Sequence, residues 1–150
     1  MKITTDISGL DRIASGLRNS ARIRKEFSPY FKQASSDLFA FSIAEAPNDK
    51  GQLAQSIELR FDGLLTSFIG TADSKCPYAK FVYMGTKAHK IGTKNKKSLR
   101  FYTGGSFVFR NNVNHPGTKP NPYLLKTYEL HENETIDILE LGAKNILEGI

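Results

Sequence analysis

The chain has 150 residues, one cysteine, no tryptophan and a formal net charge of +6. A chain of this length buries roughly 70% of its unfolded surface, so we expect a single domain over residues 1–150 with its own core. Cys76 alone excludes an intrachain disulfide, and the lack of any apolar run of signal-peptide or membrane-span length predicts a soluble protein with no membrane partner.

The charge is divided unevenly along the sequence. Residues 1–73 carry nine basic and nine acidic groups, residues 74–128 carry eleven basic groups and no acidic one, and residues 129–150 carry one lysine and six acidic groups. Opposite potentials on separate surfaces set the register of protein contacts. A general nucleic-acid binder usually has no reason to end on an acidic helix beside its basic face.

Two helices are predicted in the first third of the chain. Leu10, Ile13 and Leu17 recur at helical spacing and indicate a modest amphipathic helix over residues 8–24. Ser28-Pro29 then has the pattern of an N-cap followed by a first-turn proline, which predicts a second, long helix from there to about Ala46.

The strands follow in two groups. Alternating polar and apolar residues predict a hairpin about Asp62-Gly63, and a second pair of short strands flanks Gly104-Gly105. A short helical or irregular segment at 78–83 and a mobile basic loop at about 87–97 lie between the two groups. The predicted ranges of the four strands are 55–61, 64–71, 98–102 and 106–110.

The final segment is again helical. Asn121 is the expected cap, Pro122 suits the first turn, and apolar residues at spacings of three and four run to the C-terminus. The predicted fold class is therefore α+β: a small antiparallel sheet of about four strands packed by two or three helices, with a long helix in the N-terminal half and a C-terminal helix.

Two Gly-Thr-Lys triplets, at 85–87 and 117–119, flank the second strand pair. Glycine permits left-handed turns, and the prolines at 116, 120 and 122 prevent both helix formation and donation to a strand ladder. We therefore expect two constrained loops that bracket a hairpin.

The sequence offers little for catalysis. Six residues separate Gly85 from Gly92, so a phosphate-binding loop is not indicated, and no histidine pair has the spacing of a zinc helix. Each histidine is expected to stabilise a loop by a hydrogen bond, and we predict no catalytic residue, cofactor or metal. A small hydrolase that uses His89 or His115 is a remaining alternative, which would need a pocket.

A basic nucleic-acid-binding module is the main alternative function. Lysines interleaved with Phe101, Tyr102, Phe107 and Phe109 over the Lys87–Arg110 region resemble a stacking platform with an electrostatic funnel. Against this, those aromatic residues alternate as a core face would, and no motif of a nucleic-acid-binding fold is present.

A series of short motifs over about residues 30–130 resembles a known family. The motifs and their order along the chain resemble those of the small neck and tail-completion proteins of long-tailed bacteriophages, also called head–tail joining or minor tail proteins. The motifs are Ala46-Pro47, Gly51-Gln52-Leu53, Ser56-Ile57, Tyr78-Ala79, Gly85-Thr86, His115-Pro116-Gly117-Thr118, Pro120 and Pro122-Tyr123-Leu124.

This resemblance implies a structural protein rather than an enzyme. Its members form a ring, expected here to be hexameric, at the head-proximal end of the tail. The ring meets the tail tube protein on one side and a head-completion or connector protein on the other, with DNA only in transit through the lumen. The implied location is the neck of the virion, and the host cytoplasm during assembly.

The charge pattern gives the candidate partner interface. We hypothesise that a basic arm at 87–97 reaches a neighbour's acidic C-terminal helix or the tail tube. The candidate interface residues are Lys87, His89, Lys90, Lys94, Lys96, Lys97, Arg100, His115, Lys119, Glu132, Glu134 and Asp137.

Overall fold

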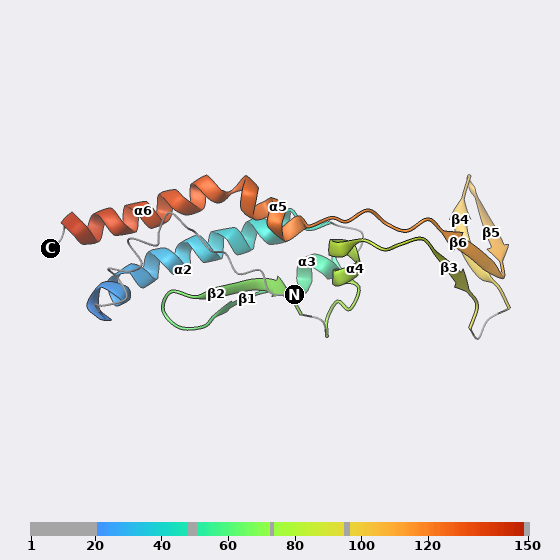
Figure 1. Ribbon diagram of the computed structural model, residues 1–150, viewed down its shortest axis with the longest axis horizontal. Helices are drawn as coiled ribbons and strands as arrows, with labels where there is room; N and C mark the ends of the chain where they lie inside the picture. Colours follow the sequence, from blue (N-terminus) through green and yellow to red (C-terminus); the bar gives the residue numbers. More distant parts are fainter. Residues whose placement is uncertain (1–20, 48–50, 73, 95–96, 149–150) are drawn as a thin grey trace. The chain divides into compact units, whose positions relative to one another are not determined.

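The computed structural model describes residues 21–47, 51–72, 74–94 and 97–148. These residues form an α+β fold, as predicted, with a long helix in the N-terminal half and another at the C-terminus (Figure 1). The chain divides into two compact units. We call the described parts of 1–79 and 122–150 the helical body, and residues 80–121 the β-ribbon.

The helical body contains four helices and one strand pair. Most of the helix predicted at 8–24 lies outside the described residues. The elements of the body are α2 (Ala21–Ala44), α3 (Gln52–Gln55), β1 (Ile57–Phe61), β2 (Ser67–Thr71), α5 (Tyr123–Leu130) and α6 (Glu132–Glu148).

The core of the body lies where α2 and α6 run side by side (Figure 1). Phe27 and Ala34 of α2 are buried against Leu139 and Ala143 of α6, with partly buried aliphatic and aromatic side chains around them. Ala34 and Ala143 let the two helix backbones approach closely, because their side chains occupy little volume, and Phe27 and Leu139 fill the space beside them. The two ends of the described chain are thus joined through one apolar seam.

The predicted helix start at Ser28-Pro29 is wrong. The helix is continuous through Pro29, and Ser28 is a buried helical residue rather than a cap. Proline inside a helix removes one backbone donor and normally costs about 3 kcal/mol. Packing outweighs this cost, because Phe27 lies in the core on the N-terminal side of the proline and Ala34 on the other. The predicted end near Ala46 is close to the observed end at Ala44.

The predicted C-terminal helix is divided in two at His131. Its ring stacks on Phe41 of α2 with 3.7 Å between centroids and 4° between planes, and its Nδ1 lies 2.9 Å from a carboxylate oxygen of Glu134. The His131 carbonyl oxygen accepts the first backbone bond of α6, from Thr135. Pro122, not Asn121, occupies the cap position of α5. Tertiary contacts of one side chain therefore set the break.

The hairpin predicted about Asp62-Gly63 is confirmed. β1 and β2 are antiparallel, with Ile57 opposite Thr71 and Phe61 opposite Ser67. The connection covers residues 62–66 instead of two residues, and Gln55, predicted as the first residue of the strand, is the last residue of the short helix α3.

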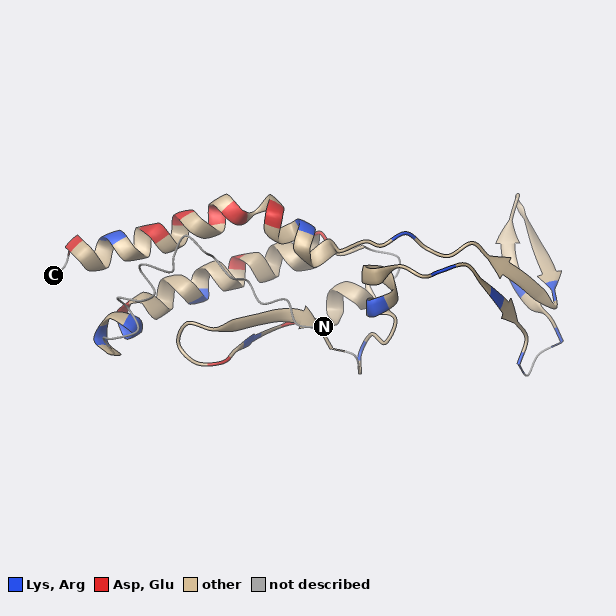
Figure 2. Ribbon diagram, in the orientation of Figure 1, with Lys and Arg blue, Asp and Glu red and all other residues tan. Residues whose placement is uncertain are grey.

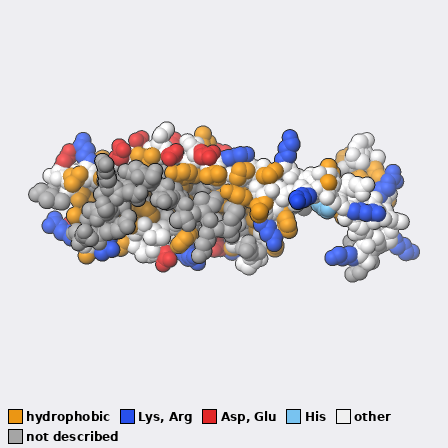
Figure 3. Space-filling model, in the orientation of Figure 1, with side chains coloured by type: hydrophobic (Ala, Val, Ile, Leu, Met, Phe, Trp, Pro, Cys, Tyr) orange, Lys and Arg blue, Asp and Glu red, His pale blue; other side chains and the backbone are white. Residues whose placement is uncertain are grey.

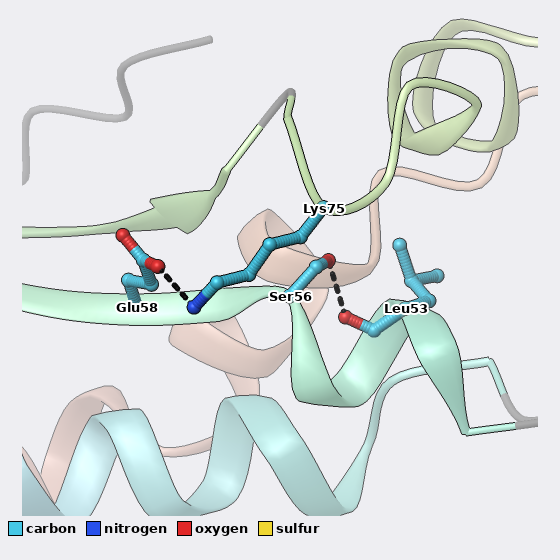
Figure 4. Close-up of polar contacts among 4 residues, drawn as sticks. All are labelled: Leu53, Ser56, Glu58 and Lys75. Carbon is cyan, nitrogen blue, oxygen red and sulfur yellow. Dashed lines mark hydrogen bonds and ion pairs between the residues drawn. The ribbon is translucent and has the colours of Figure 1, made fainter.

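Ser56 joins α3 to β1 and is fully buried (Figure 4). Its hydroxyl donates to the Leu53 carbonyl oxygen at 2.7 Å, and its own carbonyl oxygen accepts from the Ala72 backbone at 2.9 Å. Nearby, Lys75 and Glu58 form an ion pair at 2.6 Å in which both side chains are more than half exposed. The Ser56–Leu53 hydrogen bond is therefore shielded from solvent, whereas the Lys75–Glu58 ion pair is exposed to it.

Replacing Ser56 by alanine should lower the free energy of unfolding by about 1 to 2 kcal/mol, because a buried hydrogen bond is lost. Glu58→Gln removes the exposed ion pair and should change the free energy of unfolding by less than about 1 kcal/mol. Denaturant titration of both variants measures the difference. An equal loss in the two variants would contradict this assignment of their roles.

Candidate functional site

The β-ribbon is built from one short helix and four strands. Its four strands form two separate antiparallel pairs, and β1–β2 of the helical body is a third. The single sheet predicted from residues 55–61, 64–71, 98–102 and 106–110 is therefore not formed. The elements are α4 (Ala79–Met84), as predicted near 78–83, followed by β3 (His89–Gly92), β4 (Leu99–Thr103), β5 (Ser106–Arg110) and β6 (Asn112–His115).

The basic segment 87–97, predicted as a loop, contains a strand. β3 pairs antiparallel with β6, from His89 opposite His115 to Gly92 opposite Asn112. The partner strand lies beyond the next hairpin and has no strong local strand pattern, so the pairing is set by the chain's return and not by local propensity. Outside β3, residues 93, 94, 97 and 98 have no strand assignment.

The two Gly-Thr-Lys triplets pair with each other. Thr86 and Thr118 form a β-bridge in the same register as β3–β6, with backbone bonds of 3.0 and 3.1 Å in the two directions and 3.1 Å between their hydroxyl oxygens. Both glycines have positive φ, +71° for Gly85 and +90° for Gly117. A Cβ on Gly85 would lie 2.5 Å from the Thr118 carbonyl oxygen, and one on Gly117 would overlap that of Thr86.

His89 and His115 both make the loop-stabilising hydrogen bonds expected of them. His89 Nδ1 donates to the Lys87 carbonyl oxygen at 2.8 Å, whereas His115 Nδ1 accepts from the Gly117 backbone N–H at 3.0 Å. The two rings lie 5.1 Å apart at 31°. We call the paired segments 86–92 and 112–118 the stem of the β-ribbon. The two histidine bonds hold its backbone between the triplet bridge and the first pair of β3 and β6.

The hairpin predicted about Gly104-Gly105 is confirmed as β4–β5. Both glycines have positive φ, at +59° and +83°, as a two-residue hairpin turn requires. Because opposed residues share a face, Arg100 opposite Phe109 and Tyr102 opposite Phe107 lie on one side of the hairpin. We call these four residues the aromatic face.

The aromatic face is exposed, although sequence reasoning interpreted these rings as a core face. Tyr102, Phe107 and Phe109 are 66%, 54% and 56% exposed. The Arg100 guanidinium lies 4.1 Å from the centre of the Phe107 ring, and Tyr102 meets the same ring edge-on at 5.2 Å. Apart from Arg100, none of these residues was in the predicted interface, because alternation alone does not say which face of a hairpin is covered.

No described residue of the β-ribbon is buried. Apolar side chains outside the aromatic face are also exposed, among them Phe81, Met84 and Ile91. Two-stranded pairs without a packed face are marginally stable in water. The ribbon therefore presents apolar surface and strand edges in the arrangement expected of an element that another molecule covers.

The predicted basic interface residues lie along the ribbon (Figure 2). Lys87, Lys90 and Lys119 are exposed near the stem, Lys94 and Lys97 lie between β3 and β4, and Lys96 falls outside the described residues. The segment 80–121 has nine basic and no acidic residues, so no carboxylate of its own can neutralise them.

The predicted acidic interface residues lie at the start of α6, in the helical body (Figure 2). Glu132 accepts a 3.2 Å hydrogen bond from the Tyr128 hydroxyl, Glu134 contacts His131, and Asp137 is exposed. Burial of the Tyr128 hydroxyl, together with the nearby Glu132 carboxylate, raises the pKa of Tyr128. Figure 3 shows acidic side chains next to hydrophobic ones along this helix.

Within the described ranges, no group of three or more histidine, cysteine, aspartate or glutamate side chains is placed to hold a metal ion. Across the same part of the chain, no helix has the length and apolar character needed to span a bilayer. No protein-family model matches the chain, and neither the curated proteins nor the solved structures contain a match.

Proposed function

We propose that this chain is a structural assembly subunit, a tail-completion or head–tail joining protein of a long-tailed bacteriophage. It acts as a ring at the head-proximal end of the tail, between the tail tube and the head connector, and is located in the virion neck after assembly in the host cytoplasm. The short motifs from Ala46 to Leu124 support the choice of family, and the β-ribbon supports an assembly role.

The observation that carries the assembly role is the uncovered ribbon. It has defined strand register and sterically locked glycines, yet no described residue in it is buried. The β-ribbon has a defined backbone geometry but buries none of the side chains that the structure describes in it. Contact with another subunit explains this, because that contact would bury the exposed apolar side chains of the ribbon. In a ring, each subunit contacts one neighbour through one surface and the other neighbour through a different surface. Every chain must therefore carry both of these surfaces.

Reversing charge on the ribbon should weaken assembly. Lys87→Glu with Lys90→Glu changes the net charge by the same amount as Lys25→Glu with Lys32→Glu, a matched control on exposed positions of α2. We expect the ribbon variant to weaken association by at least about tenfold, most strongly at low salt, because opposed potentials become like potentials.

Sedimentation velocity over a concentration series, with electron microscopy of the rings, measures this effect. The α2 control should associate like the unmodified chain. Equal assembly by both variants, or a chain that stays monomeric at every concentration and with every neck component, would reject the proposed function.

A nucleic-acid-binding module is the second candidate, and the exposure of the aromatic face favours it. Three rings beside Arg100 on an acid-free ribbon match a platform on which bases stack. Binding to single-stranded DNA would then fall with salt at a slope near −0.7 per phosphate neutralised. A filter-binding titration at two salt concentrations separates this function from assembly.

A further inference from the structure

The aromatic face needs a partner of a particular kind. It combines three exposed rings with a guanidinium, and tyrosine, phenylalanine and arginine are enriched at the centres of protein interfaces. The ribbon that carries it has basic residues and no acidic one, so two ribbons side by side would repel each other. A second copy must therefore meet the aromatic face with a different, acidic surface.

The outer side of α6 has that character. Glu134, Asp137, Leu141, Lys144 and Glu148 follow at spacings of three, four, three and four, so they share one face of the helix. Lys144 pairs with Glu148 at 3.8 Å, and the three carboxylates leave this face negative. Leu141 is 53% exposed, whereas Thr135, Leu139, Gly142 and Ala143 on the opposite side are buried against the body. We call Glu134, Asp137, Leu141 and Glu148 on this side the acidic face.

The acidic face offers both charge and apolar contact. Among the described residues, Asp137 has no ion-pair partner, and Leu141 stands between it and Glu148. Arg100 is the charged member of the aromatic face, and the rings around it provide the apolar counterpart of a leucine. The two surfaces thus match in sign and in apolar content.

We infer that the aromatic face of one copy docks on the acidic face of α6 in a second copy of this chain. The contact is heterologous, because each copy contributes a different surface, and it repeats from subunit to subunit. This inference rests on the proposed function and identifies the two surfaces through which neighbouring subunits of the ring would contact each other. Arg100 meets Asp137 across the contact, and Phe107 covers Leu141.

Cysteine cross-linking between two differently tagged chains tests the contact. One chain carries Phe107→Cys and the other Leu141→Cys, while native Cys76 is fully buried and remains in both. After oxidation we expect a disulfide that joins the two tags, detected by gel shift and mass spectrometry. The matched control is Ser106→Cys, the neighbouring position on the opposite side of the hairpin, which should lose the product.

A charge exchange tests the pairing independently of oxidation. Arg100→Glu alone and Asp137→Lys alone should each weaken self-association by at least about tenfold, and an equimolar mixture of the two chains should recover part of that loss. Recovery requires that the two positions meet in different copies, so it does not follow from either substitution acting on folding.

The experiments distinguish a failure of the proposed docking from a failure of the proposed function. Assembly that persists without the mixed disulfide, or a disulfide that forms equally from Ser106→Cys, overturns the docking and leaves the assembly role intact. A chain that never associates overturns both. DNA binding that is lost on Phe107→Ala, with self-association unaffected by Asp137→Lys, assigns the aromatic face to nucleic acid and overturns the inference.

Discussion

Replacing Gly142 by alanine should lower the free energy of unfolding of the helical body by about 2 kcal/mol, although alanine is the better helix former. A Cβ at this position would lie 2.5 Å from Cγ and 2.8 Å from Cβ of Tyr30 on α2. The Tyr30 Cβ is attached to the backbone and cannot swing aside, so the two helices must separate. In an unobstructed helix the same substitution would stabilise by about 1 kcal/mol.

The sign of the change therefore separates the two effects, and thermal or denaturant unfolding measures it. In a Tyr30→Ala background the contact with Cγ is gone but the contact with Cβ at 2.8 Å remains, so Gly142→Ala should still destabilise, by a smaller amount than in the unmodified chain. Tyr30→Phe serves as a further control, because it removes only the 3.0 Å bond that Asn145 donates to the tyrosine hydroxyl. Stabilisation by Gly142→Ala in the unmodified chain would contradict close packing of α2 on α6.

Local patterns in the sequence identified the elements whose geometry is set locally. Gly104-Gly105 specifies its own turn, and both flanking strands follow from alternation, so β4–β5 is predicted within a residue of its observed bounds. β1–β2 also follows from local alternation, although its strands begin at residues 57 and 67 and not at the predicted 55 and 64. The segment predicted at 78–83 is the helix α4, one residue further along. These elements need no distant partner to form.

The errors arise where distant residues decide the structure. Ser28-Pro29 has a helix-start pattern, but burial of Phe27 against α6 extends the helix through it. β3 has no apolar alternation, and it becomes a strand only because residues 112–115 return beside it. His131 breaks the last helix through its contact with Phe41, more than eighty residues earlier in the chain.

The charge distribution of the candidate site follows from the sequence, but the exposure of its aromatic side chains does not. The acid-free segment and the acidic helix can be counted in the sequence, whereas the exposed rings require the structure. One signal was available: the two Gly-Thr-Lys triplets lie 32 residues apart on either side of a hairpin, and such symmetry favours pairing of the two. The triplets were interpreted as two separate loops that bracket the hairpin, and they are one paired stem.

Replacing Gly117 by alanine should open this stem. Gly117 has a φ of +90°, where a residue with a side chain is strained by about 1 to 3 kcal/mol. The added Cβ would also overlap the Thr86 carbonyl oxygen, an acceptor in the bridge between the triplets. The carbonyl oxygen belongs to the backbone and the Cβ is bonded directly to it, so neither can rotate away and the bridge must break. We expect a local loss of about 3 kcal/mol, or roughly hundredfold faster amide exchange near Thr86 and Thr118.

Gly105→Ala is the matched control, since Gly105 has a similar φ of +83° in the same ribbon but open space around its Cβ position. It carries the strain without the overlap, so it should leave the stem protected. Hydrogen-exchange mass spectrometry on both variants reports residues 80–121 separately from α2, which should be unchanged in each.

If the stem presents the aromatic face to a neighbour, Gly117→Ala will also abolish assembly while the helical body stays folded. Assembly at the unmodified level with an open stem would show that the register of β3 and β6 is not needed for docking.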